Sequence, residues 1–179
     1  KDEFLKDFKK SLDLHRQVYD YFVSVPDTLQ MAYALDGITV ALNNLDSLEA
    51  AGISGRKSLE LYRAKGDLRG MSVSLNNLAH LYKRHGMLAQ AEPFLREGLQ
   101  LMEKSGDQRY IPVCQSNLGN CLLELNKLDE AEAFLLQSKV GLQPFNEPRE
   151  IANVELALAK LYQRKGQTDQ ALLHRIEFD

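Results

Sequence analysis

The sequence predicts an all-α protein, a right-handed superhelical solenoid of antiparallel helix pairs. Its clearest feature is an internal repeat, because the segment from Leu75 matches the segment from Gln115 at an offset of 40. Large apolar residues also recur at helical spacing in each copy, and no segment shows the β-branched alternation of a strand. A repeat of this length is one helix pair, which buries its apolar face by stacking on the next pair.

Five columns of residues coincide when the repeat is laid over itself. A small residue in the first helix and an alanine in the second let the two helices of a pair approach closely. Glycine or asparagine stands where the first helix ends, and both tolerate the left-handed backbone of such an end. The columns are Leu78, Leu118 and Leu158; Ala79, Gly119 and Ala159; Tyr82, Leu122 and Tyr162; Gly86, Asn126 and Gly166; and Ala91, Ala131 and Ala171.

Helix boundaries follow from the same periodicity and from the turn residues. Pro93 falls inside an expected helix, but near its start, where backbone donors lack partners in any helix. The other four prolines fall in or beside connections. The expected helices span residues 2–23, 27–50, 55–65, 68–85, 88–104, 108–125, 128–140, 148–165 and 168–177.

The part of the chain before Gly70 follows the repeat less closely. ALNNLDSL at Ala41 matches SLNNLAHL at Ser74 at an offset of 33, whereas the segments at Ser58 and Gly98 match at an offset of 40. Either the first hairpin is shortened around Gly52–Gly55, or residues are missing there. We predict one domain, with partial repeats and an N-terminal cap over 1–71 and repeats over 72–111, 112–151 and 152–179.

The motif within each copy resembles the tetratricopeptide repeat. Ala79 is followed by an aromatic residue three positions on, a glycine four later and an alanine five later. The usual repeat has about 34 residues; the 40-residue length, with LNNLAHLY followed by AEPF, resembles the longer repeats of kinesin light chains and similar bacterial regulators. This resemblance implies a non-enzymatic scaffold or adaptor that binds a peptide or protein segment in the concave groove of the array.

Helical register places candidate binding residues on the concave side of the first helices. In the resembling families, an asparagine in the column of Asn77 and Asn117 typically bonds the main chain of an extended peptide, because an amide both donates and accepts. The alternative is that these amides bond neighbouring helices. Basic residues in the set favour an acidic partner segment. The candidates are Asn44, placed in this column by the 33-residue match, Asn76, Asn77, His80, Lys83, Arg84, Asn117, Asn120, Lys160 and Arg164.

Composition and motifs argue against other functions. A net charge of −3 without a basic block argues against nucleic acid, and the absence of an apolar run of about 20 residues argues against a membrane span, so we expect a cytoplasmic protein. Cys114 and Cys121 lie about 10.5 Å apart on a helix, too far for a disulfide. The four histidines are scattered, and no phosphate loop or nucleophile motif occurs, so we expect no enzyme activity, no metal and no cofactor.

A second class of function stays open. The array could be the regulatory or sensory part of a larger signalling or transcription-control protein, restraining an output domain. Flanking sequence would separate this class from a free scaffold. The apolar helix faces at the ends of an array also allow a homo-oligomer.

Overall fold

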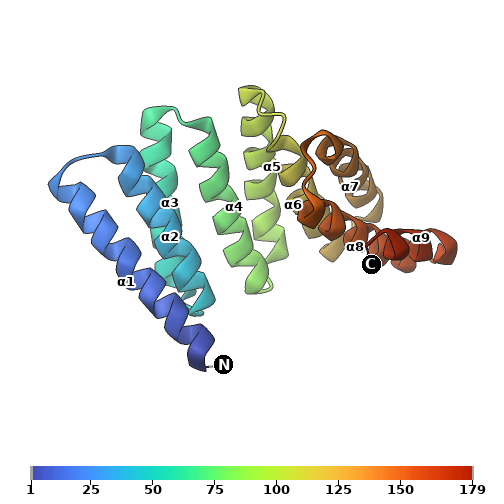
Figure 1. Ribbon diagram of the computed structural model, residues 1–179, viewed down its shortest axis with the longest axis horizontal. Helices are drawn as coiled ribbons and strands as arrows, with labels where there is room; N and C mark the ends of the chain where they lie inside the picture. The colour runs from blue at the N-terminus through green and yellow to red at the C-terminus, as the bar shows by residue number, and fades with distance from the viewer. Residues whose placement is uncertain (1, 179) are drawn as a thin grey trace. The chain divides into compact units, whose positions relative to one another are not determined.

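The computed structural model describes residues 2–178, and this part of the chain is helical throughout, without a β-strand (Figure 1). The prediction of an all-α array of sequential helices is confirmed. The helices are α1 (Asp2–Ser24), α2 (Thr28–Asn44), α3 (Leu48–Lys65), α4 (Leu68–Arg84), α5 (Leu88–Ser105), α6 (Ile111–Glu124), α7 (Leu128–Leu142), the short 3-10 helix η1 (Gln143–Phe145), α8 (Pro148–Arg164) and α9 (Thr168–Phe178).

The chain divides into two compact units, residues 1–101 and 102–179. In unit 1, α2 packs against α1, α3 and α4, and α3 packs against α4. In unit 2, α7 packs between α6 and α8, α8 packs against α9, and α6 also contacts α8. Each unit therefore pairs first helices with second helices and first helices with one another. The predicted repeat boundaries at residues 72, 112 and 152 stay a prediction.

The 40-residue period extends further upstream than the sequence matches indicated. The first helices α2, α4, α6 and α8 end at Asn44, Arg84, Glu124 and Arg164, and this spacing equals the repeat period throughout. A residue with positive φ follows two positions later in each copy: Asp46 (63°), Gly86 (74°), Asn126 (60°) and Gly166 (73°). Asp46 is thus the fourth member of the predicted turn column. Aspartate enters this left-handed region more readily than most residues.

This turn corrects the expected helices at 27–50 and 55–65. The hairpin turns at residues 45–47, and α3 runs without interruption through Gly52 and Gly55. Gly55 serves packing rather than a turn, since a Cβ atom there would lie 2.8 Å from Cδ2 of Leu78. The 33-residue match is a coincidence of sequence, because the position equivalent to Asn44 is Arg84 and not Asn77. Helix spacing is regular there, which argues against missing residues.

The small-residue columns lie where the two helices of a pair cross, as predicted. Gly119 is buried, and a Cβ atom on it would lie 2.8 Å from Cγ of Leu135 and 3.3 Å from its backbone nitrogen. Four alanines of these columns are also buried, Ala79, Ala91, Ala131 and Ala159, whereas Ala171 is half-buried. Helix α5 continues through Pro93, which confirms that expectation.

A serine-to-carbonyl hydrogen bond recurs at the opposite end of three helix pairs, α2–α3, α4–α5 and α6–α7. Ser58 Oγ on α3 donates to the Ala32 carbonyl at 2.8 Å, and Ser138 Oγ on α7 donates to the Pro112 carbonyl at 2.7 Å. In the pair between them the partners are exchanged, since Ser72 Oγ on α4 donates to the carbonyl of Gly98 on α5 at 3.0 Å. At this position α5 carries Gly98, whereas α3 carries Ser58 and α7 carries Ser138. One side-chain hydroxyl is thus kept at each crossing.

Acidic side chains cap the first helices with the same period. Asp27 accepts from the backbone of Leu29 and Gln30, and Asp67 accepts from Gly70. An aspartate in this position satisfies backbone donors that the helix leaves unpaired.

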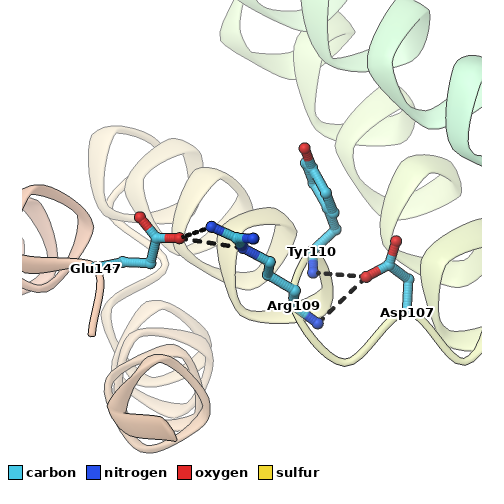
Figure 2. A network of polar contacts seen from close by, with 4 residues as sticks. All are labelled: Asp107, Arg109, Tyr110 and Glu147. Atoms are coloured by element: carbon cyan, nitrogen blue, oxygen red, sulfur yellow. Dashed lines mark hydrogen bonds and ion pairs between the residues drawn. The ribbon is translucent and has the colours of Figure 1, made fainter. Parts of the chain in front are cut away.

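The third and fourth members of this column, Asp107 and Glu147, both contact Arg109 in unit 2, from opposite sides (Figure 2). Asp107 accepts from the backbone nitrogens of Arg109 and Tyr110, each at 3.2 Å. Glu147 makes no side-chain cap on α8 and instead accepts from Nε of Arg109 at 3.1 Å. The start of α6 is therefore linked to the start of α8.

Candidate functional site

A groove between α6 and α8 in unit 2 is the candidate site. It holds a cavity of about 210 Å³, which receives side chains from both first helices of this unit. Three of the predicted binding residues, Asn117, Asn120 and Lys160, come together here. The residues that line this α6–α8 groove are Ser116, Asn117, Asn120, Glu150, Asn153, Leu156, Ala157 and Lys160.

Amide and charged groups dominate the groove. Asn120 Nδ2 donates to the Ser116 carbonyl of its own helix at 2.9 Å, which orients the Asn120 side chain and leaves its oxygen free of that bond. Asn117 and Asn120 are half-buried, whereas Asn153 and Lys160 are exposed. Glu150 and Lys160 lie about 15 Å apart along α8 at 1.5 Å per residue. An acceptor and a donor of opposite charge therefore mark the two ends of the groove.

The equivalent face of α2 and α4 in unit 1 has different chemistry. Tyr33, Val40 and Val73 are 63%, 44% and 40% exposed on it, so large apolar groups replace the amides of unit 2. His80 is exposed on α4, whereas Asn76 and Lys83 are half-buried on the same helix. In unit 1, fewer of the predicted binding residues are therefore exposed than the sequence indicated.

Asn77 lies against a neighbouring helix. It is half-buried on α4, and its side chain lowers the pKa of Asp36 on α2, although less than the hydrogen bond from Ser74 does. This contact is the alternative role considered for the asparagine column.

Asn44 and the two candidate arginines connect helix ends. Asn44 Nδ2 donates to the Val40 carbonyl at 2.8 Å, and its oxygen accepts from Nη1 of Arg84 at 3.4 Å. Arg164 Nη1 donates to the Leu123 carbonyl at the end of α6 at 2.6 Å. Both arginines thus bind the end of the preceding first helix, which occupies some of the guanidinium donors.

A family model for the tetratricopeptide repeat matches residues 70–139. The chain contains tetratricopeptide repeats. Such repeats commonly present surfaces that bind other proteins. A search of curated proteins found no match.

Solved structures of tetratricopeptide proteins share the fold. BtubC from P. vanneervenii superposes with a TM-score of 0.81 at 17% identity, over 94% of this chain and 70% of that one. A kinesin-light-chain-like repeat protein of Podosopora anserina gives 0.74 at 14% identity, over 99% and 89%. A Rap protein solved with Competence and Sporulation Factor gives 0.83 at 16% identity, over 97% of this chain and 48% of that one. This chain therefore spans about half the length of the Rap protein, and identities this low show the fold alone.

Clusters of charge outside the groove stabilise the repeats. Lys165 on unit 2 binds Asp129 Oδ1 at 2.6 Å and also Glu132, whose other oxygen accepts from the Tyr162 hydroxyl at 2.7 Å. Lys165 lowers the pKa of both carboxyl groups, and burial with the Glu132 contact raises the pKa of Tyr162 to about 12.

Two further polar groups were missed by the sequence reasoning. Glu155 on α8 and Asp36 on α2 are 1% and 6% exposed, although each is flanked by apolar residues in the sequence. The sequence did contain a signal for such a residue, namely an acid inside a helical stripe of otherwise apolar residues.

The described residues offer no group of three or more His, Cys, Asp or Glu side chains arranged to hold a metal ion. Within the same residues, no helix has both the length and the apolar character needed to cross a membrane. Cys121 is buried and Cys114 half-buried, and the two do not form a disulfide.

Proposed function

We propose that this chain is a non-enzymatic interaction module that binds an extended peptide or protein segment in the α6–α8 groove, as a scaffold or adaptor. The observation that carries the proposal is the convergence of Asn117 and Asn120 from α6 with Asn153 and Lys160 from α8 on one cavity. Amides and a cation from two helices therefore face a common space.

The asparagine side chains of the groove are suited to bind the main chain of a peptide. An asparagine amide can donate to a peptide carbonyl and accept from a peptide N–H, so it pairs with backbone groups whatever the side chains are. A cavity of about 210 Å³ is smaller than the 300–1,000 Å³ of typical small-molecule pockets. It fits one or two side chains of a segment that continues beyond it.

The opposite charges at the two ends of the groove favour one orientation of a bound segment. Glu150 and Lys160 lie about 15 Å apart, which an extended segment spans with four to five residues at ~3.3 Å each. We infer that a bound segment places an acidic group near Lys160 and a basic or amino group near Glu150.

A regulatory role is the second candidate. It is supported by the likeness to a Rap protein whose structure contains Competence and Sporulation Factor, of which this chain spans 48%. In that case the groove would still bind a segment, and binding would change the state of an attached output domain.

Selection of peptides from a displayed random library on the intact chain tests the proposal. The best binders are then measured against wild type, the double variant Asn117→Ala/Asn120→Ala and the control Gln115→Ala. Gln115 lies on α6 as well, but its amide donates to Gln137 on α7 at 3.2 Å and stands outside the groove. Two lost hydrogen bonds of about 0.5–1.5 kcal/mol each should raise Kd roughly 5- to 150-fold in the double variant.

Circular dichroism should show unchanged helix content in both variants. If the double variant instead melts at lower temperature and binds with unchanged affinity, the amides connect helices, and the binding surface lies elsewhere. Exchange of Lys160 for Glu provides a further test, since selected peptides should then lose their acidic residue.

A further inference from the structure

A chain of four oxygen atoms is buried between α2, α3 and α4 in unit 1. Oδ1 of Asp36 lies 2.8 Å from Ser74 Oγ, which lies 3.0 Å from Ser58 Oγ, which in turn lies 2.8 Å from the carbonyl oxygen of Ala32. Asp36 is 6% exposed, and both serines are fully buried. Three helices therefore meet at three consecutive contacts of hydrogen-bond length.

These four oxygen atoms make three contacts, but only two hydroxyl hydrogens are present to fill them. Each hydroxyl donates once, and a carboxylate and a carbonyl can only accept. The hydrogen of Ser58 is needed at the Ala32 carbonyl, where a serine donates across the equivalent crossing of the other two helix pairs. If Asp36 is ionised, Ser74 must donate to it, and the 3.0 Å contact between the serines then holds no hydrogen.

We propose that Asp36, Ser74 and Ser58 form a buried proton-binding site, in which a protonated Asp36 supplies the third hydrogen of this chain. The proton comes from solvent and forms an O–H bond on Oδ1 of Asp36, which donates to Ser74. The Ser74 hydroxyl then donates to Ser58, and the Ser58 hydroxyl donates to Ala32. Each of the three contacts becomes a hydrogen bond, and no other covalent bond changes.

The surroundings of Asp36 favour its neutral form. Its Oδ2 is buried and has no hydrogen-bond partner of normal geometry among the described atoms, which is costly for a charged oxygen. Burial raises the pKa of Asp36 to about 6, and the hydrogen bond from Ser74 is the largest effect that lowers it. Asn77 and Tyr62 thus lower the pKa less than the hydrogen bond from Ser74 does.

Other titratable groups face this cluster from each neighbouring helix. From α1, the ring of His15 packs against Gly37, the residue after Asp36. From α3, Tyr62 faces the carboxyl group, and its pKa is raised by burial and then by Asp36. On α4, His80 follows Asn77 by one turn. Histidines commonly titrate between pH 5 and 8, so a test must separate them from Asp36.

Proton uptake would also reach Asn77, which the sequence predicted as a binding residue. When Asp36 is ionised, it attracts the Asn77 amide as a donor; when it is protonated, this attraction weakens. The amide of Asn77 is then freer to bond a peptide at low pH than at high pH. This step alone rests on peptide binding by the array, extended to the predicted role of Asn77, whereas the proton site itself does not.

NMR titration of the intact, ¹³C- and ¹⁵N-labelled chain tests the inference without a partner. The Asp36 carboxyl carbon is followed from pH 3.5 to 8 in wild type and in His15→Gln/His80→Gln, which removes the nearby imidazoles. A midpoint near pH 6 in both, against about 3.9 for an ordinary aspartate, is the expected result. A midpoint below pH 5 overturns the proton site.

The Asn77 side-chain amide reports the coupling in the same spectra. Its signals should shift with the midpoint of Asp36 and lose that transition in Asp36→Asn, whose amide can donate to Ser74 as a protonated acid does. The Asn120 amide in unit 2 is the internal control and should show no change with Asp36→Asn. If Asn77 fails to follow Asp36, the coupling is wrong, while the peptide selection described above remains an independent test of the groove.

Discussion

Oε2 of Glu155 lies 2.6 Å from Nδ1 of His174, so one buried carboxylate joins α8 to α9. The other oxygen of Glu155, Oε1, lies 2.7 Å from Nζ of Lys139 on α7. The His174 ring also stacks on Tyr162 with a centroid separation of 5.3 Å. Three helices of unit 2 are thus connected through a glutamate whose side chain is 2% exposed.

Glu155→Ala should destabilise the protein by about 3–5 kcal/mol, because it leaves the Lys139 ammonium and the His174 ring without their shared partner. Urea unfolding measures the loss. Glu150→Ala on the same helix is the matched control and should change stability by less than about 1 kcal/mol, since Glu150 borders the groove. Equal effects of the two substitutions would show that the Glu155 cluster contributes no more than a surface acid.

Gly119→Leu should cost about 1–3 kcal/mol through overpacking against Leu135. Thermal unfolding followed by circular dichroism is the measurement. Gly52→Ala is the control, because a Cβ atom there first meets the flexible end of Arg56 at 3.2 Å and alanine favours a helix. A Gly119→Leu protein as stable as wild type would contradict the close crossing of α6 and α7.

Ser138→Ala and Ser72→Ala should each lower stability by roughly 0.5–1.5 kcal/mol, because each removes the hydroxyl that crosses between paired helices. Ser54→Ala is the control: its hydroxyl donates to Ala50 within its own helix at 3.0 Å and joins no second helix. The free energies of unfolding in urea compare the three. Losses no larger than that of Ser54→Ala would mean that the recurring bond does not support the crossing.

Asp36 should make the stability of the protein depend on pH between about 4 and 6. Its pKa is raised from 3.8 to about 6 in the folded protein, so the folded state holds the proton more tightly than the unfolded state. This contribution is fully present below pH 3.8 and is lost as pH rises through about 6. The loss approaches about 3 kcal/mol at 1.36 kcal/mol per pH unit.

Asp36→Asn should abolish that loss, so its stability relative to wild type should rise as the pH increases from 4 to 7.5. Urea unfolding at several pH values gives the comparison. Asp20→Asn, an exposed acid on α1, controls for the removal of a carboxyl group. If the stabilities of wild type and Asp36→Asn run parallel across this range, Asp36 has an ordinary pKa.

The sequence by itself determined the helices and the period of the array. A glycine, an asparagine and apolar residues at fixed offsets depend on local backbone preferences and helical spacing, so Gly86, Asn126 and Gly166 could be identified as turns without a structure. Asp46 was missed because aspartate occurs at many other positions, and the chance match between the segments at Ala41 and Ser74 concealed it. Gly52 and Gly55 suggested a turn for the same local reason.

The tertiary structure decided which polar residues line an open groove. Helical register places Asn77, Asn117, Arg84 and Lys160 on comparable faces, but only packing determines what each side chain meets. Asn77 meets the buried Asp36 and Arg84 meets the end of α2, whereas Asn117 and Lys160 line an open groove. A buried polar group must be paired at the cost of its availability, and the pairing depends on residues about 40 positions away that no local pattern specifies.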